Sequence, residues 1–203
     1  MKTPTENVAI YWGAFNPPTL AHGQIVEEIL KTREVSQVII SPSWEREDKD
    51  FGIQHEDRRK LINTFLQILQ ESWCNAEIDP HFFDGRNAWI TTTRAEEEYF
   101  RKILWHSPYF IFWSDVASNM HWWSNNKDRY IEEKLRKIFI NRPGYEYDFT
   151  WNGFDNYMLL DIPHVIETSS SVARELIRNK QSVKWILHPE IEKSISKNNI
   201  SYN

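Results

Sequence analysis

Cysteine is almost absent from this sequence, with Cys74 the single one among 203 residues. One cysteine excludes an intramolecular disulfide, and a chain of this length buries enough surface to hold a core without one. No apolar run is long enough to cross a bilayer, and the N-terminal stretch MKTPTENV lacks the hydrophobic segment of a secretion signal. We therefore expect a soluble protein of the reducing cytoplasm that has no membrane partner.

Positive charge is also scarce, because 24 lysines and arginines face 29 acidic residues and leave a net charge of −5. A negative chain disfavours nucleic acid as a partner, since binding to the phosphate backbone needs a positive field. A compact anion pocket built from a few basic groups and helix ends remains compatible with this charge. The histidines do not show the spacing of a zinc site, and there is neither a Gly-rich phosphate-binding loop nor a nucleophile elbow.

Short apolar runs alternate with amphipathic stretches, with no linker or repeat between them. Strands are predicted at 8–12, 37–41, 76–80, 108–113, 137–141 and 157–162. Helices are predicted at 21–33, 55–72, 92–105, 170–179 and 189–197. This alternation predicts an α/β fold, a doubly wound (Rossmann-like) parallel sheet with helices on both faces. We expect one domain over residues 1–203, whose C-terminal helices, from about residue 168, pack at the active-site end.

The stretch YWGAFNPPTLAH, residues 11–22, joins the first predicted strand to the first helix. Gly13 permits a sharp turn and a close approach of a ligand to the backbone, and Thr19 is a good N-cap. His22 lies in the first turn, where the N–H groups at a helix start favour an anion. The alternative is an ordinary strand–turn–helix junction with a solvent-facing histidine.

A second motif, ETSSSVAREL at residues 167–176, opens a later helix. The hydroxyl groups of Ser170 and Ser171, the backbone N–H groups and the Arg174 guanidinium together describe a cradle for an oxyanion. Plain helix capping is the alternative. In a parallel-sheet protein, two helix N-termini aimed across one cleft suit a polyphosphate.

Other places carry weaker signals. Asp115 follows a buried strand, where a carboxylate can accept hydrogen bonds from a ribose, although a simple loop aspartate is the default interpretation. Lys49 in the polar loop EREDKD could reach a phosphate, and Arg142 follows a strand in RPG, which is first of all a turn. The run EEE at 96–98 is interpreted as a solvated helix face.

These motifs resemble those of the nucleotidyltransferase superfamily. GAFNPPTLAH resembles its Gly-x-Phe-(Asp/Asn)-Pro and (His/Thr)-x-x-His signature, and TSSSVAREL resembles its C-terminal Ser-Ser-Thr-x-x-Arg signature. Between them, IISPSWEREDKDFGIQHEDR, FIFWSD and FINRPGY look like successive landmarks of the nicotinamide or nicotinic acid mononucleotide adenylyltransferases. The order and spacing agree from about Ile10 to the C-terminus, so the resemblance covers nearly the whole chain.

The resemblance implies transfer of AMP from ATP to a pyridine mononucleotide, which gives a dinucleotide of NAD biosynthesis and pyrophosphate. It implies Mg²⁺ held by the phosphates rather than by protein ligands. It also implies no covalent intermediate, which agrees with the lack of an activated nucleophile in the sequence. ATP and the mononucleotide would be the partners, and the oligomeric state stays open, a homo-oligomer included.

By the same resemblance, the catalytic residues would be His22, Thr19 and Arg174, with His22 steadying the α-phosphate. The ATP side would be lined by Gly13, Ala14, Phe15, Asn16, His22, Asp115, Ser170, Ser171 and Arg174. The acceptor side would be lined by Trp12, Lys49, Trp89, Thr91, Trp113, Trp123 and Arg142. Trp123 would stack on the pyridine ring, and the register of the segment 89–93 is left open.

Two positions depart from the family pattern. Trp12 stands where the family usually has a small residue beside Gly13, and Trp113 stands where it usually has the glycine of a Gly-x-Asp motif. Each change adds an indole at a strand end that faces the nucleotides. We therefore expect the two tryptophans to reshape the pyridine pocket and to bear on substrate identity more than on the reaction.

Two other functions stay open. One is adenylyl transfer to another phosphate such as phosphopantetheine, against which the chain length and the landmarks ISP and RPGY stand. The other is a non-catalytic nucleotide sensor, in which Trp12 and Trp113 fill the pocket. Within the leading interpretation, GAFNPPT and IISP favour the branch that accepts nicotinamide as well as nicotinic acid.

Overall fold

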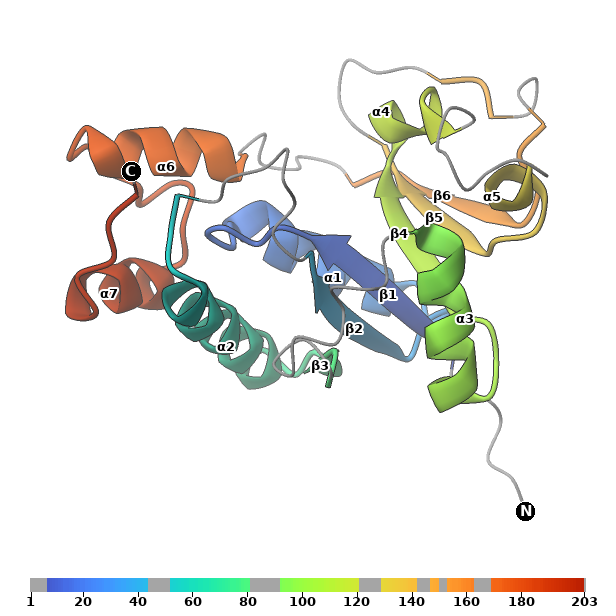
Figure 1. The fold of residues 1–203 in the computed structure, drawn as a ribbon, viewed down its shortest axis with the longest axis horizontal. Coiled ribbons are helices and arrows are strands. Elements are labelled where there is room, and N and C mark those ends of the chain that lie inside the picture. The colour runs from blue at the N-terminus through green and yellow to red at the C-terminus, as the bar shows by residue number, and fades with distance from the viewer. Residues whose placement is uncertain are drawn as a thin grey trace.

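The computed structural model describes residues 7–43, 52–80, 92–120, 129–141, 147–149, 153–162 and 169–202. Its centre is a six-stranded sheet in the order β3-β2-β1-β4-β5-β6 (Figure 1). The strands are β1 Val8–Gly13, β2 Gln37–Pro42, β3 Ala76–Ile78, β4 Tyr109–Trp113, β5 Lys137–Ile140 and β6 Tyr157–Leu160. All neighbouring strands run parallel, and the direction of winding reverses between β1 and β4. The predicted doubly wound α/β fold is confirmed.

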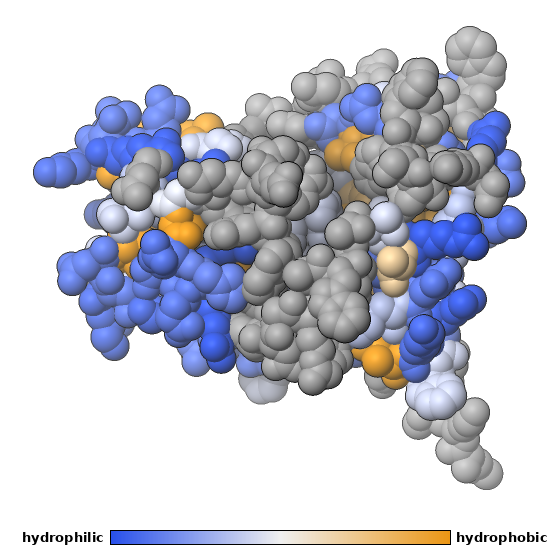
Figure 2. Space-filling view, in the orientation of Figure 1, coloured by the Kyte–Doolittle hydropathy of each residue, from blue (hydrophilic) through white to orange (hydrophobic). Residues whose placement is uncertain are grey.

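Helices flank the sheet. They are α1 Leu20–Lys31, α2 His55–Glu71, α3 Thr93–Leu104, α4 Ser114–Ala117, α5 Tyr130–Glu133, α6 Ser170–Arg178 and α7 Pro189–Lys197. The four-residue helices α4 and α5 were not predicted, because so short a segment shows no helical period. Hydrophilic side chains cover much of α2 and α7 in the view of Figure 2. Within the described ranges, no helix has the length and hydropathy needed to cross a membrane.

The side chains of β1 alternate between two hydrophobic clusters, one on each face of the sheet. Ala9 and Tyr11 point to a face that we call the α1 face, to which α1, α2, α6 and α7 contribute buried residues. Val8 and Ile10 point to the opposite face, the α3 face, to which α3, α4 and α5 contribute. This alternation decides on which side of the sheet each residue at a strand end lies.

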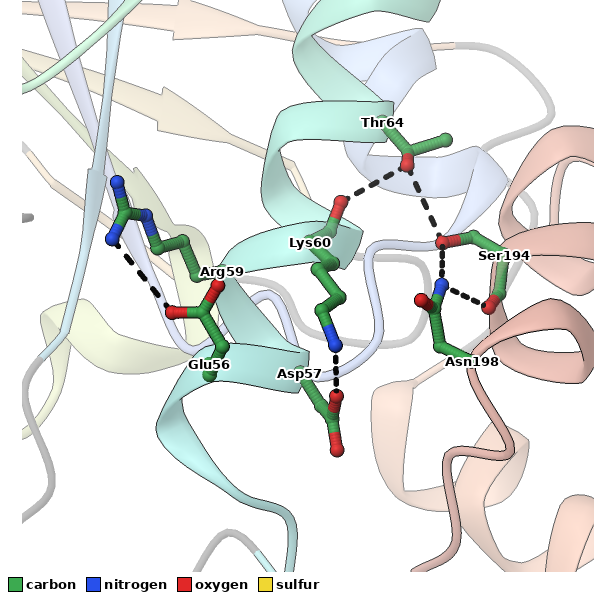
Figure 3. A network of polar contacts seen from close by, with 7 residues as sticks. All are labelled: Glu56, Asp57, Arg59, Lys60, Thr64, Ser194 and Asn198. Carbon is green, nitrogen blue, oxygen red and sulfur yellow. Dashed lines mark hydrogen bonds and ion pairs between the residues drawn. The ribbon is translucent and has the colours of Figure 1, made fainter.

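The C-terminal helices return to the first half of the chain (Figure 1). The backbone N–H of Leu20, at the start of α1, donates to the carbonyl of Ile186, between α6 and α7, at 2.8 Å. Across α2 and α7, the Thr64 hydroxyl meets the Ser194 hydroxyl at 3.5 Å (Figure 3). The Asn198 side chain donates to the Ser194 carbonyl at 2.8 Å. The first contact holds the segment between α6 and α7 at the start of α1, and the second joins α7 to α2.

The acidic run of α3 is not a solvated face, so that prediction was wrong. Glu97 is 3% exposed, and its carboxylate accepts hydrogen bonds from the hydroxyls of Ser107 at 2.8 Å and Tyr130 at 2.9 Å. Glu96 is partly buried, and Glu98 lies at the surface. The partners of Glu97 come from the segment before β4 and from α5, which no local pattern within α3 reveals.

Lys137, the first residue of β5, is a fully buried cation. Its ammonium group donates to the backbone carbonyls of Ile131 at 2.7 Å, Glu132 at 2.9 Å and Leu135 at 2.7 Å. Burial lowers the pKa of Lys137 to about 8, against the opposing effect of the Glu132 and Asp155 carboxylates. Because the carbonyls at the end of a helix have no partner within it, the lysine caps α5 and ties it to the sheet.

We expect the substitution Lys137→Met to destabilise the protein, because it keeps the apolar stem but removes the ammonium donor from three carbonyl groups. Hydrogen bonds to charged groups contribute roughly 1.5–3 kcal/mol each, so the free energy of unfolding should fall by about 3 kcal/mol or more. Urea denaturation measures this change. The control Lys134→Met, at an exposed position, should stay within about 0.5 kcal/mol of the wild type. Equal losses in both variants would contradict the capping role.

Candidate active site

The loop between β1 and α1 packs around the ring of Phe15. Phe15 is fully buried with a φ of 46°, and the Asn16–Pro17 peptide bond is cis. A Cβ atom on Gly13 would lie 3.2 Å from the Phe15 ring, closer than ordinary contact. Gly13 does not have a positive φ. A side chain at position 13 would therefore require the Phe15 ring to shift by a few tenths of an ångström, and the backbone there does not use the left-handed region that favours glycine.

Arg58 of α2 fixes the same loop. Its guanidinium group is fully buried and donates from Nε to the Ala14 carbonyl at 2.9 Å and from Nη2 to the Ser43 carbonyl at 2.6 Å. The Ser43 backbone N–H donates to the Gly13 carbonyl at 2.7 Å. The loops that follow β1 and β2 are thus joined at the carboxyl edge of the sheet. Sequence reasoning assigned no role to Arg58, whose only signal was its place in the landmark HEDR.

Thr19 and His22 cap the start of α1 together. The Thr19 backbone N–H donates to Nδ1 of His22 at 3.0 Å, and the Thr19 hydroxyl lies 2.7 Å from the same nitrogen. A ring nitrogen that accepts an N–H bond carries no proton, so the neutral imidazole holds its proton on Nε2. His22 thus takes the place of the glutamate in a capping box and keeps one N–H donor for another partner.

Aromatic rings surround the His22 side chain. The ring centroids of Phe15, Tyr11 and Phe65 lie 5.0, 6.0 and 6.5 Å from that of the imidazole. Burial among these rings lowers the pKa of His22 to about 4. The imidazole is therefore neutral near pH 7, and it can offer an N–H donor rather than a positive charge.

Helix α6 brings the second motif to the same loop. The Ser170 hydroxyl donates to the Pro17 carbonyl at 2.9 Å, and Nη1 of Arg174 donates to the Asn16 carbonyl at 2.7 Å. Nη2 of Arg174 donates to the Ser171 hydroxyl oxygen at 3.1 Å. Burial lowers the pKa of Arg174, which nevertheless stays a cation at neutral pH. The two motifs, far apart in the sequence, therefore meet at one loop.

Trp12 and Trp113 lie at the ends of neighbouring strands but on opposite faces of the sheet. Trp113 packs against the hydrophobic cluster of the α1 face. Trp12 follows Tyr11 in β1, so alternation places its side chain on the α3 face, with 41% of the residue exposed. The expectation that both indoles shape one pyridine pocket does not fit this arrangement, because the sheet lies between them.

Asp115 lies in α4, directly after the carboxyl end of β4. Since β4 neighbours β1 where the winding reverses, Asp115 stands at the position where folds of this kind bind nucleotides. The remaining predicted residues fall outside the described residues; they are Lys49, Trp89, Thr91, Trp123 and Arg142.

A cavity of about 420 Å³ lies next to this site, among residues of α1, α2 and α7. Thr19, Phe65 and His188 are among its lining residues. Most of its lining residues belong to α1 and α2, and Pro18 and Thr19 come from the loop that precedes α1. We place the candidate active site at the carboxyl edge of the sheet, because the two motifs meet there and parallel sheets bind ligands beyond the carboxyl ends of their strands.

No family model matches the chain. It is similar to a probable nicotinate-nucleotide adenylyltransferase of Clostridium perfringens, with 27% identity over 209 residues, 96% of this chain and 98% of the relative. It is also similar to a protein of the same name from Caldicellulosiruptor saccharolyticus, with 26% identity over 201 residues, 93% of this chain and 95% of the relative. The resemblance seen in the motifs is confirmed by relatives that align along nearly the whole chain.

Solved structures show the same fold. The chain matches the Plasmodium falciparum nicotinic acid mononucleotide adenylyltransferase complexed with NaAD, with a TM-score of 0.80 and 22% identity over 96% of each chain. The same enzyme complexed with APC matches with a TM-score of 0.79 and 19% identity, again over 96% of each chain. A putative nicotinate-nucleotide adenylyltransferase from Vibrio parahaemolyticus matches with a TM-score of 0.61 and 17% identity, over 95% of this chain and 93% of that one.

The hydrogen bond from Thr19 to His22 predicts the protonation state of the imidazole. We expect ¹⁵N-edited NMR of histidine-labelled protein to show His22 as the Nε2–H tautomer, with no protonation until the pH falls well below 6.5, toward about 4. Thr19→Gly removes the hydroxyl contact but keeps the backbone donor, so the tautomer should persist. A His22 resonance that titrates near 6.5, as in an exposed histidine, would contradict this geometry.

Proposed function

We infer that this chain belongs to the nicotinate-nucleotide adenylyltransferases and transfers AMP from ATP to a pyridine mononucleotide, with a dinucleotide of NAD biosynthesis and pyrophosphate as products. The observation that carries this inference is the meeting of α1 and α6, where Ser170 and Arg174 bind the loop that precedes His22. Relatives named for the activity align along nearly the whole chain. We propose that the chain acts as one catalytic domain, because α6 completes the site that β1 and α1 begin.

Adenylyl transfer depends on positioning and charge stabilisation rather than on covalent help from the protein. An oxygen of the acceptor's 5′-phosphate forms a bond to the α-phosphorus of ATP, while the bond from that phosphorus to the oxygen bridging to the β-phosphate breaks. The leaving pyrophosphate takes the electron pair. Groups that hold the reacting phosphates in line, and donors aimed at their oxygens, are therefore what the protein must supply.

His22 would supply a neutral N–H donor to an oxygen of the α-phosphate. Its Nδ1 is held by Thr19, so the direction of the Nε2–H group is set before the substrate binds. A donor that is already oriented costs no reorganisation during the reaction. Thr19 is then a positioning residue that acts through His22, while the N–H groups at the start of α1 add partial positive charge.

Arg174 and Ser171 would bind the β- and γ-phosphates. A guanidinium group has five N–H donors, of which one binds the Asn16 carbonyl and another the Ser171 hydroxyl oxygen. The other N–H groups can reach phosphate oxygens in the paired geometry that arginine favours. Because Ser171 accepts from Arg174, its own proton is free to point at a phosphate. Asp115 would accept hydrogen bonds from the ribose of ATP.

A divalent cation fits this site as a companion of ATP. The described parts of the chain contain no group of three His, Cys, Asp or Glu side chains that could hold a metal ion. We propose that Mg²⁺ is carried by the phosphates of ATP, in keeping with its preference for substrate oxygens and water. When bound, the cation neutralises phosphate charge, and the residues named above orient the same phosphates.

Pyrophosphate release tests the proposed function directly. The purified chain is incubated with ATP, Mg²⁺ and one acceptor at a time: nicotinic acid mononucleotide, nicotinamide mononucleotide or phosphopantetheine. We expect release with at least one pyridine mononucleotide, together with the matching dinucleotide in chromatography. Release with phosphopantetheine alone would instead support the other adenylyltransferase, and binding of ATP without any release would support the sensor.

Replacing His22 with alanine should lower turnover by roughly 10²–10³-fold, the usual effect of removing one oriented donor to a developing charge. A matched control is His188→Ala, because His188 also caps a helix and accepts from the Glu190 backbone N–H at 3.2 Å. The control should lose about 1 kcal/mol of stability but keep its turnover. Similar losses of turnover in both variants would show that His22 acts through folding alone.

A further inference from the structure

Tyr202 is the last described residue, and it lies in a segment that turns back after α7. Asn199 has a φ of 51°, and the backbone N–H of Ile200 donates to the carbonyl of Ile195 at 3.0 Å. This is a Schellman motif, in which a left-handed residue ends a helix and the next residue packs on its last turn. Ile195 and Ile200 are both buried in the hydrophobic cluster of the α1 face. The end of α7 therefore sets the direction of the residues that follow it.

The Tyr202 side chain faces the interior of the protein. Ser201 is exposed, whereas Tyr202 is only 6% exposed and belongs to the same cluster as Ile200. Alternate residues of the segment thus point inward, as they do in an extended chain. Ala173 of α6 is also buried in this cluster, and the C-terminus lies beside α6 in Figure 1. The end of the chain therefore returns to the helix that carries Arg174.

Two charged groups act on the Tyr202 phenol. Burial raises the pKa of this phenol, the positive charge of Arg174 lowers it, and the negative charge of Asp57 raises it. In the other direction, burial lowers the pKa of Arg174, Tyr202 raises it and Arg178 lowers it. Because the interaction between two groups weakens with the distance that separates them, the phenol lies close to the guanidinium. The end of the chain is thus a neighbour of the cation that binds phosphates in the proposed function.

The Tyr202 hydroxyl is buried and has no hydrogen-bond partner in the part of the chain that the structure describes. A buried hydroxyl without a partner costs free energy, and native structures rarely keep one. Arg174 has five N–H donors, of which the described bonds use one for Asn16 and one for Ser171. A phenol oxygen can accept a hydrogen bond as well as donate one. An unused acceptor therefore lies close to a group that has donors left for other partners.

We propose that Tyr202 is a positioning residue for ATP, whose hydroxyl oxygen accepts an N–H of Arg174 in the complex with the nucleotide. This inference rests on the proposed function, in which Arg174 binds the β- and γ-phosphates. A guanidinium group that is held by both the Asn16 carbonyl and the Tyr202 hydroxyl has its remaining N–H groups fixed in direction. Fixing these groups lowers the ordering cost of binding a phosphate. Because the bond to Tyr202 forms only in the complex, it favours the binding of ATP and not folding.

The variant Tyr202→Phe keeps the ring and removes the hydroxyl. The measurement is the Kd of ATP and the Kd of AMP, by calorimetric titration with Mg²⁺ present and no acceptor. We expect the Kd of ATP to rise roughly tenfold, the order of one hydrogen bond to a charged group, while the Kd of AMP stays within about twofold because AMP lacks the β- and γ-phosphates. The control Tyr157→Phe, at the first residue of β6, should change neither value. Equal losses for ATP and AMP in Tyr202→Phe would overturn the inference.

A double variant tests whether the hydroxyl acts through the guanidinium. Arg174→Met alone should weaken the binding of ATP by more than Tyr202→Phe does, because it removes the cation as well as its hydrogen bonds. Adding Tyr202→Phe to Arg174→Met should then change the Kd of ATP by less than about twofold. A further loss of roughly tenfold in the double variant would show that Tyr202 acts independently of Arg174, contrary to the proposal.

Melting temperatures separate this role from a purely structural one. Without ATP, Tyr202→Phe should melt no lower than the wild type, because the hydroxyl that it removes has no described partner. With ATP, the wild type should gain more thermal stability than the variant. A variant that melts lower without ATP and gains as much with it would assign Tyr202 to folding alone. A wild type that binds ATP but releases no pyrophosphate with any acceptor would overturn the proposed function only, since the titrations need no acceptor. A wild type that does not bind ATP would overturn both.

Discussion

The backbone carbonyls of the loop between β1 and α1 are the constraint on which the site depends. Arg58 donates from α2 to the carbonyl of Ala14, and Arg174 donates from α6 to the carbonyl of Asn16. A buried carbonyl without a donor costs free energy, so the loop and the two guanidinium groups determine one another's positions. If either arginine moved away, its hydrogen bond to the loop would be lost. The contacts that fold the loop therefore also place the cation that would meet a phosphate.

Arg174 and His22 pair a cation with a neutral donor, although burial lowers the pKa of both. Arg174 keeps its charge although burial lowers its pKa, because the guanidinium is so strongly basic. His22 loses its charge in a comparable environment, because the ordinary pKa of imidazole lies close to neutrality and aromatic rings surround it. A partly desolvated cation gains more from an incoming anion than an exposed one does. The neutral N–H of His22 adds direction without adding a second charge that would repel Arg174.

The sequence predicted those features that depend on interactions between residues close together in the chain. The strands and the longer helices follow from apolar periodicity, and the two motifs were expected to face one cleft because each opens a helix of a parallel-sheet fold. Contacts between distant elements could not be predicted. The burial of Glu97 depends on a contact with Tyr130, which lies in a helix too short to show a helical period. The role of Arg58 depends on its hydrogen bonds to two loops that are distant from α2 in the sequence. The packing of the Phe15 ring on Gly13 was not predicted, because Phe15 is close in sequence but its ring position is visible only in three dimensions.

Register explains why Trp12 and Trp113 are not equivalent departures from the family pattern. Tyr11 and Ile111 are Cα partners in the pair of β1 and β4, and both belong to the cluster on the α1 face. Trp12 is therefore level with Phe112. Trp113 lies one residue further along its strand, so its side chain points to the opposite face of the sheet from that of Trp12. The sequence of one strand alone cannot reveal this arrangement, because register is a property of two paired strands. In the proposed function, Trp113 then lies on the side of the sheet from which α1 and α6 would hold ATP, whereas Trp12 lies on the other side. The two tryptophans are therefore two separate departures from the family pattern, one on each face of the sheet.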